Sequence, residues 1–214
     1  MALTHQIPAT PWRATSTWSV RPAQLLPLFG GLGIFGLGEG LLVQAQWGAT
    51  PWTVFAQGIS RHSHLSIGWA TLLISMTVLL LWFPLRERPG FGTVANIVVI
   101  AWVLDVTVRY VPVASSSALK IAYIALAVGL IGNGSTWYLT TGLGPGPRDG
   151  LMTSLHRRLG ISVVYVRLVL ELTVFITGWL LGGTIGIGTA AFAGLIGYSI
   201  GLNLTLVKAL VSRR

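Results

Sequence analysis

The chain has 214 residues, of which 53% are hydrophobic and only 9% are charged, and its formal net charge is +9. Soluble domains carry about 25% charged residues, so this composition excludes an ordinary water-soluble protein. The positive charge does not indicate nucleic-acid binding, because the basic residues lie at the ends of apolar runs and not along one polar face. The sequence contains no cysteine, which excludes disulfides and thiol chemistry.

The polar, proline-containing residues 1–22 are predicted to form a mobile cytoplasmic tail, and residues 23–214 a single membrane domain. Six apolar runs in that domain each have about the 20 residues that a bilayer-spanning helix needs. They are Leu25–Ala45, Leu65–Pro84, Thr93–Tyr110, Ala118–Thr140, Ile161–Leu181 and Ile187–Val207. None of the runs alternates like a barrel strand. The predicted fold class is therefore an all-α integral membrane protein with six transmembrane helices.

The first run is rich in glycine, which favours close helix packing in a membrane. Its glycines are Gly30, Gly31, Gly33, Gly36, Gly38 and Gly40. Glu39 lies within this series. An acid at such depth is costly unless it is paired or faces a cavity, so Glu39 is a candidate site residue.

Short broken or re-entrant segments are predicted after the first and the fourth transmembrane helix. In the first half, Pro51 suits the first turn of a short helix over Pro51–Ser60, and Trp47 and Trp52 are typical of a membrane interface. In the second half, Pro147 has the same place before Arg148 and Asp149.

Arg148 and Asp149 form the most polar point of this second segment. Free N–H groups at a helix start and a guanidinium together predict a contact for an anionic substrate or lipid headgroup. The alternative is an ordinary N-terminal aspartate beside an arginine that only obeys the positive-inside rule.

Two further charge pairs have a spacing of four residues and therefore share one helical face. Asp105 and Arg109 lie in the third span, and Arg167 and Glu171 lie in the fifth. Each pair is either self-neutralised within the helix packing or contacts a substrate. We expect Arg167 and Glu171 to face the protein interior, because a charge exposed to lipid is costly by about 3 kcal/mol.

Basic residues predict the orientation of the chain. With the N-terminus inside, ten of the 14 basic residues are cytoplasmic, two are outside, and two lie within helices. Both termini are thus predicted to be cytoplasmic. His62 and His64 have no neighbouring cysteine or carboxylate in sequence, so no metal site is expected. The sequence also lacks a nucleophile–base pattern and a phosphate loop, and we predict neither enzymatic activity nor a cofactor.

The chain contains an internal repeat with an offset of 96 residues. Gly48 aligns with Gly144, Pro51 with Pro147, and the Gly-x-Gly-Thr at 90–93 with that at 186–189. Each repeat, about 25–115 and 121–211, holds three spans, an odd number, so the two repeats are predicted to be inverted in the membrane. Inverted repeats with broken segments are typical of transporters with a central site. The alternative is a duplicated scaffold that serves packing alone.

Several segments together resemble the YczE-type, YitT-like family of bacterial multi-pass membrane proteins. They are GATPWTVFAQGIS (48–60), GLGPGPRDGLM (142–152), Arg167 with Glu171, and LLGGTIGIGT (180–189). The resemblance implies a protein of the bacterial cytoplasmic membrane whose biochemical activity is not established. One departure is Thr53, since the family often has an acid after the first-half Pro-Trp.

These features lead to two hypotheses. The first is a small transporter or flippase for an anionic molecule or lipid headgroup, with its site between the repeats. The second is a non-transporting membrane protein that assists or regulates a partner protein or pathway. The expected partners are the lipid bilayer, a small anionic substrate and, as an open alternative, a second copy of the chain.

Overall fold

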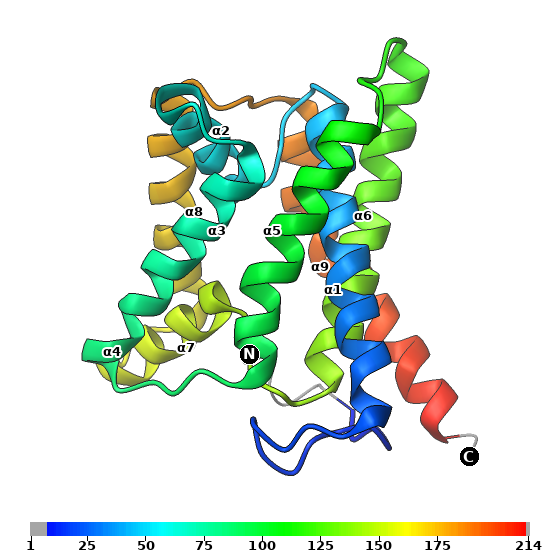
Figure 1. Ribbon diagram of the computed structural model, residues 1–214, viewed down its shortest axis with the longest axis vertical. Coiled ribbons are helices and arrows are strands. Elements are labelled where there is room, and N and C mark those ends of the chain that lie inside the picture. Colours follow the sequence, from blue (N-terminus) through cyan, green and yellow to red (C-terminus); the bar gives the residue numbers. More distant parts are fainter. Residues whose placement is uncertain (1–7, 213–214) are drawn as a thin grey trace.

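The structure is a computed structural model that describes residues 8–212, and within this range the chain forms nine α-helices and no strand (Figure 1). Six spans are long and apolar enough to cross a bilayer, which confirms the predicted all-α class and number of spans. They are α1 (Pro22–Gln44), α3 (Ile67–Leu80) with its continuation α4 (Trp82–Leu85), α5 (Phe91–Tyr110), α6 (Ser117–Thr140), α8 (Val163–Leu180) and α9 (Ile187–Ser212).

The two remaining helices are short: α2 (Pro51–Ser63) and α7 (Pro147–Leu159) have 13 residues each. Each is about 20 Å long, too short for a hydrocarbon core of about 30 Å. Each begins at a proline, whose missing N–H is not needed in the first turn, and is followed by a left-handed residue, His64 or Gly160. They lie near opposite ends of the bundle, α2 beside α8 and α7 beside α4 (Figure 1).

The most extensive helix packing is that of α1 on α6, which contact each other along much of their length. Gly38 lies against Ala127, and a Cβ at Gly134 would be 2.4 Å from the carbonyl oxygen of Gly31. The predicted packing role is thus confirmed for Gly31, Gly36, Gly38 and Gly40, whereas a Cβ at Gly30 or Gly33 would meet nothing within 4 Å. Because the residue numbers rise on one helix as they fall on the other, α1 and α6 run antiparallel (Figure 1).

A shift of 96 positions maps the helices of the first half onto those of the second. The bounds of α2 become 147–159, which are the bounds of α7, while α1, α3 and α5 fall on α6, α8 and α9. The backbone follows the same shift, since φ is 113° at Gly48 and 115° at Gly144. Three further left-handed pairs have this spacing: Gln46 and Gly142, His64 and Gly160, and Arg86 and Gly182.

Each half also binds a loop of the other half through backbone hydrogen bonds. The N–H of Gly92 donates to the carbonyl of Leu143 over 2.8 Å, and the N–H of Gly188 donates to the carbonyl of Trp47 over 2.7 Å. Gly92 and Gly188 are equivalent under the shift of 96 positions, and so are Trp47 and Leu143. The start of a long helix in one half therefore fixes the loop before the short helix of the other half.

The halves differ in how their outer helices pack. In the first half α3 packs on α5, and the N–H of Gly68 donates to the carboxylate of Asp105 over 3.1 Å. The helices α8 and α9 make no comparable contact in the described structure. Val164 and Gly201, the equivalents of Gly68 and Asp105, are correspondingly open: Val164 is 65% exposed, and a Cβ at Gly201 would meet nothing within 4 Å.

Residues 10–14 lie against the end of α6, and Thr17 and Trp18 contact the start of α5 and the loop before it. The hydroxyl of Thr10 donates to the carbonyl of Thr140 over 3.0 Å, and Trp12 stacks on Trp137 with ring centroids 5.7 Å apart. Hydrogen bonds and aromatic packing thus hold this part of the segment for which composition predicts a mobile tail. Residues 1–7 lie outside the described part of the chain.

Candidate functional site

Glu39, on α1, is the most deeply buried charged residue of the site, with 1% of its side chain exposed. Its two carboxylate oxygens accept hydrogen bonds from the hydroxyls of Thr50, over 3.3 Å, and Thr53, over 3.1 Å. Thr50 caps α2, and Thr53 lies in its first turn. The carboxylate therefore lies at the N-terminus of α2, where the helix dipole and the hydroxyl donors stabilise a negative charge.

Arg148, in the first turn of α7, brings the opposite charge to Glu39. Its Nη1 is 3.6 Å from Oε1 of Glu39, and 20% of its side chain is exposed. The guanidinium also lies over the ring of Trp52, 4.9 Å from the centroid, which is the geometry of a cation–π contact. The starts of α2 and α7 thus meet at one ion pair.

Asp149, the next residue of α7, adds a second carboxylate, which accepts a hydrogen bond from the hydroxyl of Tyr138 on α6 over 2.9 Å. We call the whole group the central cluster; its members are Glu39, Thr50, Trp52, Thr53, Tyr138, Arg148 and Asp149. With both carboxylates ionised and the guanidinium protonated, its formal charge is one negative unit.

The repeat relates the members of the central cluster to one another. A shift of 96 positions takes Trp52 to Arg148, so the cation–π contact joins two equivalent positions. The same shift takes Thr53 to Asp149 and Glu39 to Ser135. Each half therefore has one acid and one hydroxyl at these two positions, with their places exchanged. The acid that the family resemblance leads us to expect at Thr53 is absent, and Glu39 lies against this residue in its place.

Buried hydrogen bonds fix the start of α7. The indole N–H of Trp82 donates to the carbonyl of Pro147 over 3.0 Å, and the hydroxyl of Thr93 donates to that of Pro145 over 2.8 Å. Gly150 lies on the ring of Trp82, where a Cβ would be 2.0 Å from a ring carbon. Arg148 is thus presented by a rigid turn.

Four candidate residues lie outside the central cluster. Asp105 accepts from the backbone of α3, as described above, and Arg109 lies over the ring of Tyr110, 5.7 Å from the centroid. Arg167 and Glu171 bind each other over 2.9 Å on α8, with 44% and 32% of their side chains exposed. Both side chains are therefore partly exposed on the surface of the chain, whereas the sequence led us to expect that they face the protein interior.

Trp52 differs from its prediction. It is only 6% exposed, so it is a core residue and not an interface residue. Its indole N–H is buried without a hydrogen-bond partner in the described structure. The site residues predicted from the sequence did not include Tyr138, and they included Thr50, Trp52 and Thr53 only as part of a segment, Gly48–Thr53, expected at the outer mouth of a cavity. The repeat, which aligns Trp52 with Arg148 and Thr53 with Asp149, was the available signal.

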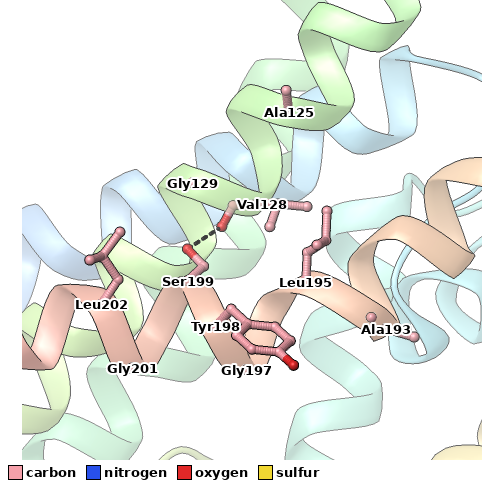
Figure 2. A pocket seen from close by; sticks show the side chains of 11 residues that line it. Ala125, Val128, Gly129, Ala193, Leu195, Gly197, Tyr198, Ser199, Gly201 and Leu202 are labelled. Atoms are coloured by element: carbon pink, nitrogen blue, oxygen red, sulfur yellow. Dashed lines mark hydrogen bonds between the residues drawn. The ribbon is translucent and has the colours of Figure 1, made fainter.

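A separate hollow of about 890 Å³ lies between α6 and α9 (Figure 2). It is lined by uncharged residues, among them Val128, Gly129, Gly197, Tyr198 and Ser199. Its polar contact, from the hydroxyl of Ser199 to the carbonyl of Val128, is satisfied within the chain at 3.0 Å. The hollow therefore offers mostly apolar volume, with the hydroxyl of Tyr198 as a further polar group. Within residues 8–212, no group of three His, Cys, Asp or Glu side chains could hold a metal ion.

Comparisons with known proteins agree with this architecture. The chain is 41% identical over 204 residues to an "Uncharacterized protein" of Haemophilus influenzae, with 95% of this chain and 94% of the relative covered. It is 33% identical over 192 residues to the "Uncharacterized membrane protein YczE" of Bacillus subtilis, with 87% and 89% covered. No solved structure matches.

These relatives cover nearly the whole chain, so the similarity concerns the complete bundle and not one segment. It confirms the resemblance to YczE-type proteins, and it agrees with the six apolar spans in identifying a multi-pass membrane protein. A family profile described as "Family of unknown function (DUF6198)" matches residues 23–204. The chain therefore belongs to the DUF6198 family, and it is a YczE-type membrane protein.

Proposed function

We propose that the protein is a small transporter or flippase whose substrate binds at the central cluster, between two inverted repeats. The observation that carries this proposal is the meeting of two short helices at one buried ion pair. Glu39 lies at the start of α2, and Arg148 extends from the start of α7. Short helices whose N-termini point to a polar centre are typical of transporter substrate sites.

Three observations support the inverted arrangement. The helix bounds and left-handed positions follow the 96-residue shift, the backbone bonds between the halves are reciprocal, and α1 and α6 are equivalent helices that run antiparallel. The unequal packing of α3 on α5 and of α8 near α9 supports alternating access, because inverted repeats in different conformations define one open side. The short helices α2 and α7 would then be re-entrant from opposite faces.

Cysteine labelling tests the inversion. His62 and Arg158 are equivalent, exposed positions at the ends of α2 and α7, and the protein has no native cysteine. In intact cells a membrane-impermeant maleimide is expected to label the His62→Cys variant, and the Arg158→Cys variant only after permeabilisation. Labelling of both variants from the same side would exclude inverted repeats with cytoplasmic termini.

An anionic substrate is the class that Arg148 supports. Its guanidinium is a planar donor, it remains partly exposed, and the unpartnered N–H of Trp52 belongs to the ring beneath it. Glu39 already opposes this guanidinium, so an anion binds only by taking the place of the Glu39 carboxylate. A carboxylate, a phosphate or the headgroup of an anionic lipid has the required chemistry.

The Arg148→Lys variant tests the anion contact. Purified protein is screened for thermal stabilisation by anionic metabolites and lipid headgroups, and the affinity of each stabilising anion is measured. We expect lysine to weaken binding about tenfold or more, because an ammonium cannot replace a two-pronged guanidinium contact. Arg157→Lys, on the same helix but bound to Glu87 in the loop before α5, is the matched control. Equal affinity of the Arg148→Lys protein and wild type would remove the bidentate anion site.

One observation favours the second function, a non-transporting protein that assists a partner. The Arg167–Glu171 pair is partly exposed on α8, where charges facing lipid are costly, and a partner protein covering α8 would remove that cost. Stoichiometric co-purification of another protein, together with no response to any anion, would support this function over transport.

A further inference from the structure

The charges of the central cluster set a condition on any anion that binds there. Glu39 and Asp149 are negative and Arg148 is positive, which leaves one negative unit before a ligand enters. Asp149 is exposed, so its charge is solvated, whereas Glu39 and most of Arg148 are buried. At this buried pair a monovalent anion would add one uncompensated negative charge. Uncompensated charge in a membrane protein interior is costly, so neutralising one carboxylate makes binding of the anion more favourable.

Within residues 8–212, Arg148 is the charged residue that pairs with Glu39. The polar contacts of Glu39 are the hydroxyls of Thr50 and Thr53 from α2 and the guanidinium of Arg148 from α7. The charged groups of α5 are engaged elsewhere, since Asp105 accepts from Gly68 and Arg109 lies over Tyr110. The compensating charge must therefore come with the substrate or from solution.

Glu39 is the carboxylate whose neutralisation frees Arg148. It is the counter-ion of this guanidinium, whereas Asp149 is bound to the hydroxyl of Tyr138. The hydroxyls of Thr50 and Thr53 donate to the charged carboxylate, and after rotation each can accept from a protonated one. A neutral Glu39 thus keeps its hydrogen bonds without a change of backbone.

On the basis of the proposed transport function, we propose that Glu39 takes up one proton when a monovalent anion binds Arg148. The carboxylate becomes a carboxylic acid that donates to a threonine hydroxyl, and Arg148 stays protonated and exchanges Glu39 for the anion. The formal charge of the central cluster is one negative unit before and after binding. Proton and anion therefore cross the membrane together, as a symport.

Proton counting with a simple anion tests this inference. Acetate and nitrate serve as probes, because neither titrates between about pH 6 and about pH 9. Binding to purified wild-type protein is measured by calorimetry in two buffers of different ionisation enthalpy. We expect uptake of one proton per anion, and an affinity that falls about tenfold per pH unit where Glu39 is ionised.

The Glu39→Gln variant carries an uncharged side chain of similar shape. It is expected to bind the probes without proton uptake and with an affinity independent of pH. Glu87→Gln, which changes an acid in the loop before α5, is the control that should keep the pH dependence of wild type. If the Glu39→Gln protein does not elute as a folded species, the proton count and the pH dependence of wild type decide alone.

Two outcomes would overturn the inference. Probe binding to wild type without proton uptake would exclude proton linkage while leaving the anion site and the proposed transport intact. Failure of wild type and of folded Glu39→Gln to bind either probe at the lowest pH would show that neutral residue 39 does not make Arg148 available. The cysteine-labelling experiment and the Arg148→Lys binding experiment test the proposed transport function independently of this inference.

Discussion

Gly134→Val is expected to prevent stable packing of the two halves. A Cβ at Gly134 would lie 2.4 Å from the carbonyl oxygen of Gly31 and 2.7 Å from the backbone nitrogen of Phe35. Backbone atoms cannot rotate away as a side chain can, so α1 and α6 would have to separate. Overpacking of this kind costs about 3 kcal/mol. We expect a large fall in the thermal unfolding midpoint in detergent and loss of the monodisperse species in size exclusion.

Gly129→Val is the matched control for this prediction. Gly129 lies on the same helix, and a Cβ there would meet nothing within 4 Å. Both substitutions introduce the same β-branched residue into α6, so a difference between them reports the helix crossing and not helix propensity. Similar unfolding midpoints of the two variants would contradict the close α1–α6 contact.

Glu39→Leu is expected to cause the second large loss of stability, because it leaves the positive charge of Arg148 without a partner. Without Glu39, the mostly buried guanidinium of Arg148 loses its counter-ion, and breaking a buried pair from one side costs about 3 kcal/mol. The double variant Glu39→Leu with Arg148→Met removes both charges. It should regain stability to within about 1 kcal/mol of wild type, since apolar replacement of a buried ion pair is often neutral.

The same variants distinguish the role of the ion pair in stability from its role in anion binding. The double variant is expected to unfold like wild type and yet to bind no anion, because the guanidinium is gone. A double variant as unstable as Glu39→Leu alone would show that Arg148 and Glu39 do not act as a pair. Chemical denaturation in detergent, with the single Arg148→Met variant included, gives the coupling free energy between the two residues.

Sequence reasoning predicted the spans of this protein well, because membrane insertion depends on local composition. A run of about 20 apolar residues needs no knowledge of its neighbours to be recognised. The short helices were recognisable for a similarly local reason, since Pro51 and Pro147 begin them. The equivalence of Gly48 and Gly144, which share a left-handed backbone conformation, was visible in the sequence repeat.

The contacts of the central cluster were not predictable in this way. Glu39 and Arg148 are far apart in sequence, and any of several arginines could have opposed Glu39 until the helices were placed. Sequence reasoning selected Arg148 as an anion contact and did not foresee that the chain supplies its own carboxylate there. It also assigned Trp52 to the interface, because aromatic residues near the ends of spans usually lie there.

Arg148 and Trp52 are equivalent positions of the two halves, and their contact limits how the protein can have arisen. In a dimer of identical half-length chains with this arrangement, the position would face a copy of itself. Two arginines there would repel each other in a medium of low dielectric constant, and two tryptophans would leave Glu39 without a counter-ion. Fusion of the halves into one gene removes this restriction, because a mutation then changes one side only. A single cation over a single aromatic ring is thus an asymmetry that requires two halves of different sequence.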